Sequence, residues 1–264
     1  MGFVTVLRLA SWNIFRGRTR DCDRFDLELV LAALRDLDAD VVALQEVDRD
    51  QEESGASDQA RVLAEALGMD WRYAPTLRGP LGRDPATGRP AATPAGPGAA
   101  DEGGPAYGIA LLSRRPFRRA ETVALPGGRG MEPRVALLTQ VPTDGGLVTV
   151  AGTHLANSLP TSIGQLRFLQ RELSGWPAPR VLLGDLNLWL PLVRVASGRG
   201  WRPLVRGGTW RNRPPGAFGW TVQLDHVLAN GAGLRAGRSR IHAGPASDHR
   251  AVLVEIEVAP ATRR

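Results

Sequence analysis

The feature that most constrains the fold of this chain is a short apolar run that ends in two polar side chains. Val181, Leu182 and Leu183 follow one another, which is typical of a strand buried on both faces. Asp185 and Asn187 come directly after the run. Polar groups held at the end of a rigid strand can meet a ligand at a fixed distance. Taken alone, the segment is explained more simply as a strand followed by an Asx-type turn.

Apolar patterns along the rest of the chain predict an α/β fold in which many strands alternate with a few helices. The predicted strands cover residues 4–14, 40–44, 71–74, 107–113, 135–141, 147–151, 181–183, 222–228, 234–241 and 251–258. The strand at 222–228 is interrupted by Asp225 and His226. The predicted helices cover residues 25–37, 57–67, 162–173 and 192–200.

The connections indicate one domain over residues 1–264. The turn sequence Asp144-Gly145-Gly146 predicts an antiparallel hairpin between strands 135–141 and 147–151. Residues 75–105 are rich in Pro, Gly and Ala, a composition that cannot build a packed core. We therefore expect a long mobile loop there rather than a linker between two domains.

The charge of the chain favours phosphate-bearing partners only weakly. The 264 residues carry a formal charge of +6, and every basic residue is arginine. Such a uniform choice indicates a compositional bias as much as a need to bind anions. A basic surface still attracts phosphoester substrates, nucleic acids among them.

Cysteine content and hydropathy predict a cytoplasmic protein. Cys22 is the only cysteine, so an intrachain disulfide is impossible and a reducing compartment is favoured. The N-terminus lacks a basic leader followed by an apolar segment, and no apolar run is long enough to cross a bilayer. We expect a monomer without stable membrane insertion.

Eight polar residues lie in or next to predicted strands and form the candidate site. They are Asn13, Glu46, His154, Asp185, Asn187, Asp225, Asp248 and His249. Each has an ordinary structural explanation, such as a solvated strand end, a hydrogen-bonded histidine or a turn cap. Together they are hard to explain as structure, because a core gains nothing from so many ionisable groups. Carboxylates gathered in one place stay ionised only if a metal cation or an arginine compensates their charge, and Asp, Glu and Asn oxygens suit Mg²⁺ better than Zn²⁺.

An ordered series of short motifs then resembles the endonuclease/exonuclease/phosphatase superfamily. The motifs are Ser11-Trp-Asn-Ile14, Gln45-Glu46, Gly108-Ile-Ala-Leu-Leu-Ser113, Thr153-His-Leu155, Gly184-Asp-Leu-Asn187, Leu224-Asp-His226 and Ser247-Asp-His249. The resemblance covers nearly the whole chain. It implies a DNase I-like four-layered α/β sandwich, with two central mixed β-sheets packed face to face and helices outside. It also implies cleavage of a phosphoester bond that depends on Mg²⁺ or Mn²⁺.

The resemblance also implies roles for the metal-side residues. Glu46 matches the principal metal carboxylate of the family, with Asn13 beside it as a ligand or near-ligand. Asp248 matches a further position near the metal.

The remaining motif residues match the catalytic positions of the family. Asp185 matches the residue that orients and deprotonates the attacking water, and Asn187 matches its partner. His249 matches the histidine that binds the scissile phosphate, and Asp225 matches the carboxylate that orients it. His154 matches a second phosphate-side histidine of the phosphodiesterase and phosphatase branches.

Residues outside these motifs are candidates for substrate binding. Arg134 lies in Glu-Pro-Arg, and Trp210, Arg211 and Arg213 combine arginine with an aromatic ring. Such a combination can grip a phosphate and stack on a base, although an ordinary Arg-rich surface loop explains it equally well.

Three functions remain open on the sequence. The favoured function is a metal-dependent phosphodiesterase or nuclease. The alternatives are a phosphatase or phospholipid-type phosphodiesterase that acts on a small or lipid phosphoester, and a binding module that has lost its chemistry.

Overall fold

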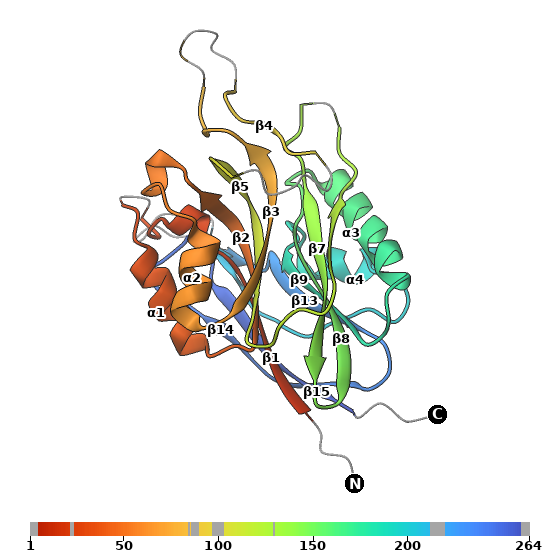
Figure 1. Ribbon diagram of the computed structural model, residues 1–264. Coiled ribbons are helices and arrows are strands. Elements are labelled where there is room, and N and C mark those ends of the chain that lie inside the picture. The colour runs from red at the N-terminus through yellow and green to blue at the C-terminus, as the bar shows by residue number, and fades with distance from the viewer. Residues whose placement is uncertain are drawn as a thin grey trace.

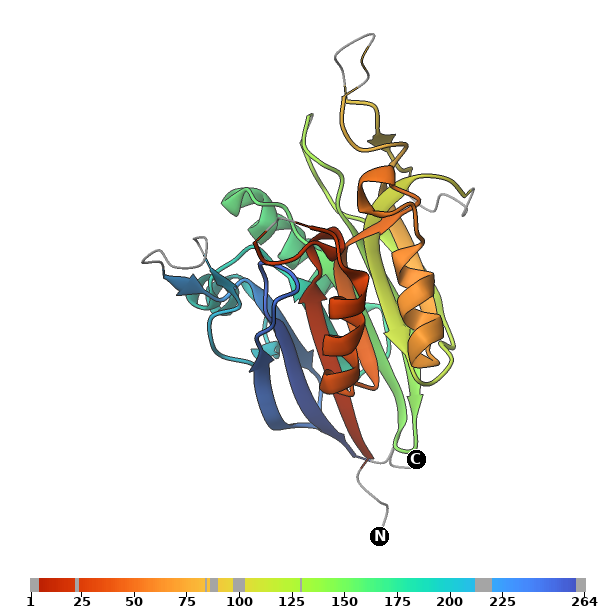
Figure 2. The same cartoon turned by 90° about the vertical axis from the view of Figure 1, so that its left-hand side faces the viewer.

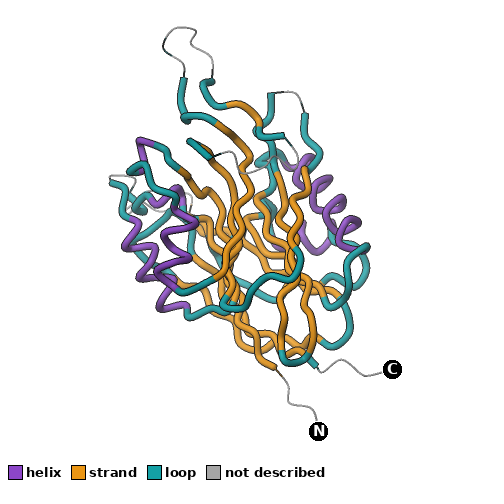
Figure 3. The backbone as a smooth tube through the Cα atoms, in the orientation of Figure 1, coloured by secondary structure: helices purple, strands orange, loops and turns teal. Residues whose placement is uncertain are grey.

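The structure is a computed structural model, and it describes residues 5–21, 24–83, 85, 90–96, 103–128, 130–211 and 220–259. Two large β-sheets form the centre of the molecule, and helices lie on both outer sides (Figure 3). The expected DNase I-like four-layered α/β sandwich is confirmed.

The first sheet has seven strands in the order β14-β15-β1-β2-β5-β3-β4. Their bounds are Leu234–His242 (β14), Ala251–Val258 (β15), Thr5–Asn13 (β1), Val41–Arg49 (β2), Ala106–Ser113 (β5), Asp70–Arg78 (β3) and Thr93–Pro94 (β4). Only β1 and β2 pair in parallel within this sheet as the structure describes it. The sheet is therefore mixed, as expected.

The second sheet has six strands in the order β10-β13-β9-β8-β7-β6. Their bounds are Arg202–Pro203 (β10), Asp225–Asn230 (β13), Arg180–Asp185 (β9), Gly146–His154 (β8), Val135–Thr143 (β7) and Ala120–Ala124 (β6). The predicted hairpin is confirmed, because β7 and β8 pair antiparallel, and β8 pairs in parallel with β9. A small third sheet joins β11 (Trp210–Arg211) to β12 (Thr221–Val222).

The helices form the two outer layers. Helices α1 (Leu27–Leu37) and α2 (Gln59–Leu67) cover the first sheet, as Figures 1 and 2 show from two sides. Helices α3 (Leu159–Ser174) and α4 (Leu190–Ala196) cover the second sheet. Two short 3₁₀ helices, η1 (Phe15–Gly17) and η2 (Glu52–Ser54), follow β1 and β2.

Successive side chains of a strand point to opposite faces of its sheet, so the buried apolar residues form three separate clusters. One cluster contains residues of both sheets and fills the space between them. Val181 and Leu183 of β9 belong to it, whereas Leu182 packs in the cluster under α3 and α4. Asp185 is two residues beyond Leu183, so it continues the row of side chains that faces the first sheet. The inner core therefore ends in polar residues at one end of the sandwich.

The predicted ends of two strands were wrong, and with one of them the start of the predicted loop. Strand β2 continues to Arg49, whereas the predicted strand covered residues 40–44. Strand β3 reaches Arg78 and pairs with β4, so residues 75–78 and 93–94 of the predicted loop 75–105 belong to the first sheet. Residues 84, 86–89 and 97–102 of that loop lie outside the described residues.

The predicted strand 222–228 was also wrong, because it is two strands in different sheets. Val222 belongs to β12, and Asp225 opens β13 rather than interrupting a strand. The short strands β6, β10 and β11 had no clear apolar pattern and were not predicted.

None of the helices in the described part of the chain has the length and apolar character that crossing a membrane requires.

Gly184 offers a direct test of how closely β9 and β8 approach. A Cβ atom at Gly184 would lie 2.1 Å from the backbone oxygen of Thr153. We expect Gly184→Ala to lower the free energy of unfolding by roughly 1–3 kcal/mol or more. Thermal and urea unfolding measure the change.

Gly164 is the matched control, since a Cβ there meets nothing within 4 Å inside helix α3. Gly164→Ala should raise the free energy of unfolding by about 0.5–1 kcal/mol. Equal effects of the two substitutions would show that the contact between β9 and β8 is not as tight as the structure has it.

Candidate functional site

The ends of three neighbouring strands place three candidate residues side by side. His154 at the end of β8 is in register with Asp185 at the end of β9. Asp185 is in turn in register with Asp225 at the start of β13. All three side chains are buried and continue the inward-facing rows of their strands. The second sheet therefore presents them together at one end of the inner core.

The first sheet contributes Asn13 and Glu46 to the same place. Asn13 at the end of β1 pairs with Gln45 of β2. The pairing of β2 with β5 shifts between Gln45 and Val47, and Glu46 has a φ of 53°. This β-bulge turns Glu46 out of the strict alternation of β2, which would otherwise point it toward the helices.

The Asn13 amide connects the two sheets. Its Nδ2 donates to Glu46 Oε1 at 2.9 Å and to Asp185 Oδ2 at 3.2 Å. Its Oδ1 accepts the backbone N–H of Phe15 at 3.0 Å, which fixes the orientation of the amide. Asn13 therefore orients the two carboxylates, and its place as a ligand or near-ligand of a metal stays a prediction.

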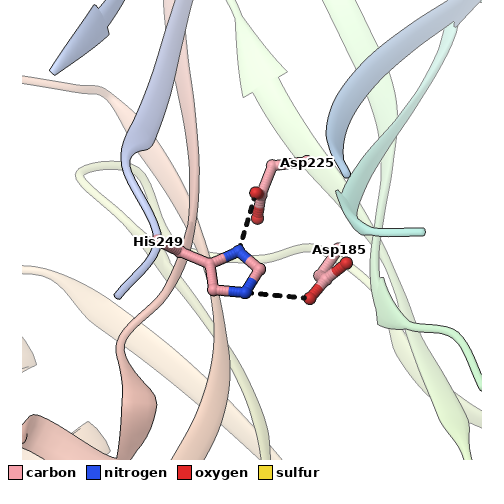
Figure 4. A group of neighbouring side chains, drawn as sticks. All are labelled: Asp185, Asp225 and His249. Atoms are coloured by element: carbon pink, nitrogen blue, oxygen red, sulfur yellow. Dashed lines mark hydrogen bonds and ion pairs between the residues drawn. The ribbon is translucent and has the colours of Figure 1, made fainter. Parts of the chain in front are cut away.

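His249 lies between two carboxylates, as Figure 4 shows. Its Nδ1 donates to Asp225 Oδ2 at 2.9 Å, and its Nε2 lies 3.7 Å from Asp185 Oδ2. Burial alone would lower the pKa of His249, but Asp225 and Asp185 outweigh it and raise the pKa to about 10. The imidazole is therefore positively charged at neutral pH.

His154 has the opposite character. Burial lowers its pKa well below the usual value, and the positive charges of Arg134 and His249 lower it further. Its Nε2 is 3.5 Å from Asp185 Oδ2. A neutral and a charged imidazole therefore face the same carboxylate.

Asp185 is held by its own loop. Its Oδ1 accepts the backbone N–H of Asn187 at 3.0 Å. Asn187 has a φ of 50° and donates its side-chain Nδ2 to Leu155 O at 2.9 Å. Burial raises the pKa of Asp185, which His249 opposes. A carboxylate made more basic in this way suits proton abstraction.

Asp248 is placed by the turn that carries His249. Ser247 has a φ of 62°, and its Oγ donates to Asn13 O at 2.7 Å and accepts the N–H of His249 at 3.0 Å. Trp210 Nε1 donates to Asp248 Oδ2 at 3.2 Å. The turn is thus attached to β1, which brings residues from both ends of the chain together.

The donor set fits a hard divalent cation beside Glu46 and Asp248. Oδ1 of Asp248 is buried without a hydrogen-bond partner among the described residues. Burial raises the pKa of Glu46, and the negative charges of Asp185 and Asp248 raise it further. Half-buried carboxylates that repel one another are stabilised by a cation, and oxygen donors suit Mg²⁺ or Mn²⁺. Asp185, Asp225 and His249 also have ligand atoms within 4.8 Å of one another, but the Asp225–His249 hydrogen bond occupies two of them.

The predicted substrate-binding residues divide into three cases. Trp210 lies next to the site, with its ring 6.5 Å from that of His249, and Arg211 follows it in β11. Arg134 is buried near His154 and pairs with Glu132 at 3.2 Å. Arg213 lies outside the described residues.

Two supporting residues were missed by the sequence analysis. The buried hydroxyl of Thr209 accepts the N–H groups of Leu224 and Asp225, at 3.0 and 3.1 Å, and so fixes the start of β13. His226 donates Nε2–H to Leu188 O at 2.8 Å and accepts at Nδ1 from Gln223. Thr209 gives no signal in the sequence, whereas His226 could have been found from its outward-facing place in the alternation of β13.

A family model described as "Endonuclease/Exonuclease/phosphatase family" matches residues 10–249. The comparison with curated proteins gives no match.

Solved structures of this family resemble the chain along almost its full length. The endonuclease/exonuclease/phosphatase from Beutenbergia cavernae has 25% identity and a TM-score of 0.75, over 96% of this chain and 72% of that one. A family protein from Bacteroides thetaiotaomicron has 17% identity and a TM-score of 0.69, over 97% and 99% of the two chains. D. rerio TDP2, solved in complex with single-strand DNA product, has 17% identity and a TM-score of 0.68, over 96% and 99%.

The charge on His249 can be tested without metal. Because the folded-state pKa of about 10 exceeds the ordinary 6.5, protonation of His249 stabilises the fold fully below pH 6.5. That contribution is lost as the pH rises through about 10. We expect Asp225→Asn to lower the pKa of His249, as measured by NMR titration of the imidazole in EDTA.

The pair of exposed Asp36 and half-buried His242, 3.2 Å apart, supplies the control. Asp36→Asn should leave the titration of His249 unchanged. An Asp225→Asn variant in which His249 titrates as in the unmodified protein would contradict the assigned cause.

Proposed function

Because the chain belongs to the endonuclease/exonuclease/phosphatase family, we propose that it hydrolyses a phosphodiester bond in a reaction that depends on Mg²⁺ or Mn²⁺. The observation that carries the proposal is the charged imidazole of His249 between Asp225 and Asp185. Attack of water at phosphorus builds negative charge on the phosphoryl oxygens. A fixed cation beside a buried base is the arrangement that such a reaction needs.

Asp185 is the proposed general base. Its Oδ2 accepts a proton from the water that attacks phosphorus, while its Oδ1 stays hydrogen-bonded to the backbone of Asn187. The Asn13 amide keeps Oδ2 in place until the water and the phosphate enter. Asn187 steadies the loop and orients the water.

His249 is the proposed phosphate-binding cation. Asp225 fixes the ring through Nδ1, so Nε2–H is available to a non-bridging oxygen of the phosphate. Neutral His154 supplies a second nitrogen on the same side. Arg134 and Trp210, with Arg211 and Arg213, are proposed to contact the substrate beyond the scissile phosphate.

Glu46 and Asp248 are the residues that would hold the metal ion. A bound divalent cation polarises the phosphoryl oxygens and lowers the pKa of coordinated water. The part of Asn13 is then to keep Glu46 in its bulged position. Proton transfer is then the proposed role of Asp185 in the second sheet. Phosphate binding is the proposed role of His154 in that sheet and of His249 in the turn.

A nucleic acid is the favoured substrate. The fold is shared with D. rerio TDP2, whose crystal structure holds a single-strand DNA product, and the chain carries a formal charge of +6. We also propose a cytoplasmic location, because a single cysteine favours a reducing compartment, and a monomeric state. A panel of DNA, RNA, sugar phosphates and phospholipids, with Mg²⁺, Mn²⁺ or EDTA, separates this function from the phosphatase and phospholipid alternatives.

Removal of the base is the first functional test. Asp185→Asn should lower kcat by about 10²–10⁴-fold on whichever substrate is turned over, because a positioned base is lost. Circular dichroism should show the same fold, since Asn has the same shape as Asp. An Asp185→Asn variant that keeps normal kcat would remove Asp185 from the role of base.

Removal of the metal carboxylate is the second test. Glu46→Gln should weaken Mn²⁺ binding by roughly 10–100-fold or more, as measured by calorimetry. Glu65→Gln, an exposed residue on α2, should leave Mn²⁺ affinity unchanged. If both variants bind Mn²⁺ like the unmodified protein, the cation site does not include Glu46.

A further inference from the structure

A cavity of about 590 Å³ lies on the outer face of the second sheet, between α3, the segment that follows α4, and the strands β9 and β13. Its residue from β9 is Arg180, which is five residues before Asp185 in the same strand. The Cα atoms of these two residues are therefore roughly 16 Å apart. Arg180 shares the outward-facing row of Leu182, whereas Asp185 lies in the inward-facing row. The cavity is thus separate from the cluster around His249.

The charged side chains that line this cavity are all arginines, and no carboxylate of the described residues lines it. They are Arg167, Arg171, Arg180 and Arg199. None of these arginines forms an ion pair within the part of the chain that the structure describes. Arginines elsewhere do pair with carboxylates, as Arg61 does with Glu65 and Arg115 does with Asp144. The cavity therefore gathers positive charge that the protein itself does not compensate.

Arg180 is half-buried, although its guanidinium meets only neutral acceptors. Its Nε donates to Trp176 O at 2.7 Å, its Nη1 to Asn230 Oδ1 at 2.9 Å and its Nη2 to Ser174 O at 3.2 Å. These bonds fix the position of the group without an opposite charge beside it. Because a charge partly removed from water is costly unless it is paired, an anion in the cavity would stabilise Arg180.

Two more of the arginines are one turn apart on helix α3. Arg167 and Arg171 have the i, i+4 spacing that places them on one face, where like charges repel each other. The Nε of Arg167 donates to Ala196 O at 3.4 Å, at the end of α4. The remaining nitrogens of Arg167, and all those of the Arg171 guanidinium, have no partner among the described residues. They are available to a ligand that would relieve the repulsion.

The segment that carries Arg199 is ordered by contacts with α3. Buried Gln170 accepts the N–H of Gly198 at 2.8 Å and donates to Ser197 Oγ at 3.2 Å. The N–H of Trp201 donates to Gly198 O at 3.3 Å. Arg199 lies between these bonded residues, so its backbone is already fixed and little conformational freedom is lost there on binding.

We propose that this cavity is a second anion site, which binds the diphosphate or triphosphate group of a small molecule. The inference goes beyond the proposed function and does not depend on it. A guanidinium can hold two phosphate oxygens at once, and arginines from separate segments suit a ligand with several negative charges. The volume of about 590 Å³ lies within the range of roughly 300–1,000 Å³ that is usual for small-molecule sites. A nucleic-acid backbone is instead bound along an extended groove.

Calorimetric titration with pyrophosphate, in EDTA and at low ionic strength, measures the binding. The unmodified protein should bind pyrophosphate more tightly than orthophosphate, because the larger anion reaches arginines of more than one segment. Arg167→Gln and Arg171→Gln should each weaken pyrophosphate binding about tenfold, since a hydrogen bond to a charged group is lost. Both side chains are exposed, so circular dichroism should show an unchanged fold.

Arg194→Gln is the matched control, because Arg194 is an exposed arginine of α4 that does not line the cavity. This variant should bind pyrophosphate as the unmodified protein does. An Arg167→Gln protein that keeps full affinity, or an Arg194→Gln protein that loses as much affinity, overturns the inference. Equal affinity of the unmodified protein for pyrophosphate and orthophosphate overturns it as well.

A comparison of a nucleoside triphosphate with inorganic triphosphate identifies the source of the phosphate group, since Trp201 also lines the cavity. Tighter binding of the nucleotide points to a nucleotide ligand, and equal binding points to an inorganic polyphosphate. In either case Arg167→Gln should weaken the binding of both about tenfold. A thymidine tetranucleotide that binds through Arg167, with no binding of pyrophosphate, would place a nucleic-acid backbone in the cavity and overturn the inference.

Discussion

The hydrogen bonds of the Asn13 amide are the interaction on which the site depends. One NH₂ group reaches carboxylates of both sheets, Glu46 from the first and Asp185 from the second. The relative position of the Glu46 and Asp185 carboxylates is therefore set by how the two sheets pack. A shift of either sheet would stretch one of these bonds, and active groups tolerate errors of only about 0.5 Å. The close-packed inner core therefore helps to fix the geometry of the candidate site.

The protonation state of each side chain in the site is set by its burial and its neighbours rather than by its residue type. His249 and His154 lie at the same carboxylate, yet one is charged and the other neutral. The difference follows from Asp225, which faces His249, and from Arg134, which adds positive charge near His154. A single type of side chain thus supplies a cation and a neutral donor or acceptor within one cluster.

The sequence predicted most elements and the identity of the clustered residues, because both follow from local patterns. The residues Asn13, Asp185 and Asp225 continue the two-residue alternation of their strands, which is visible without a structure. The bulge at Glu46 was not predictable, because a non-glycine residue with a φ of 53° is stabilised by tertiary contacts. The hydroxyl of Thr209 and the orientation of the Asn13 amide are likewise set by contacts between distant segments. The alternation of side chains along the strands therefore predicts which residues belong to the site. The hydrogen bonds between these residues can be known only from the fold.

The place of β1 in the first sheet has a consequence for how the protein is made. This strand lies between β2 and β15, and β15 is the last strand of the described chain to leave the ribosome. One edge of β1 is therefore left unpaired through most of synthesis, and open strand edges invite pairing with other chains. The turn at Ser247 that carries His249 is attached to Asn13 only when this late strand docks. A nascent chain thus completes the cluster around His249 in the same event that pairs the open edge of β1.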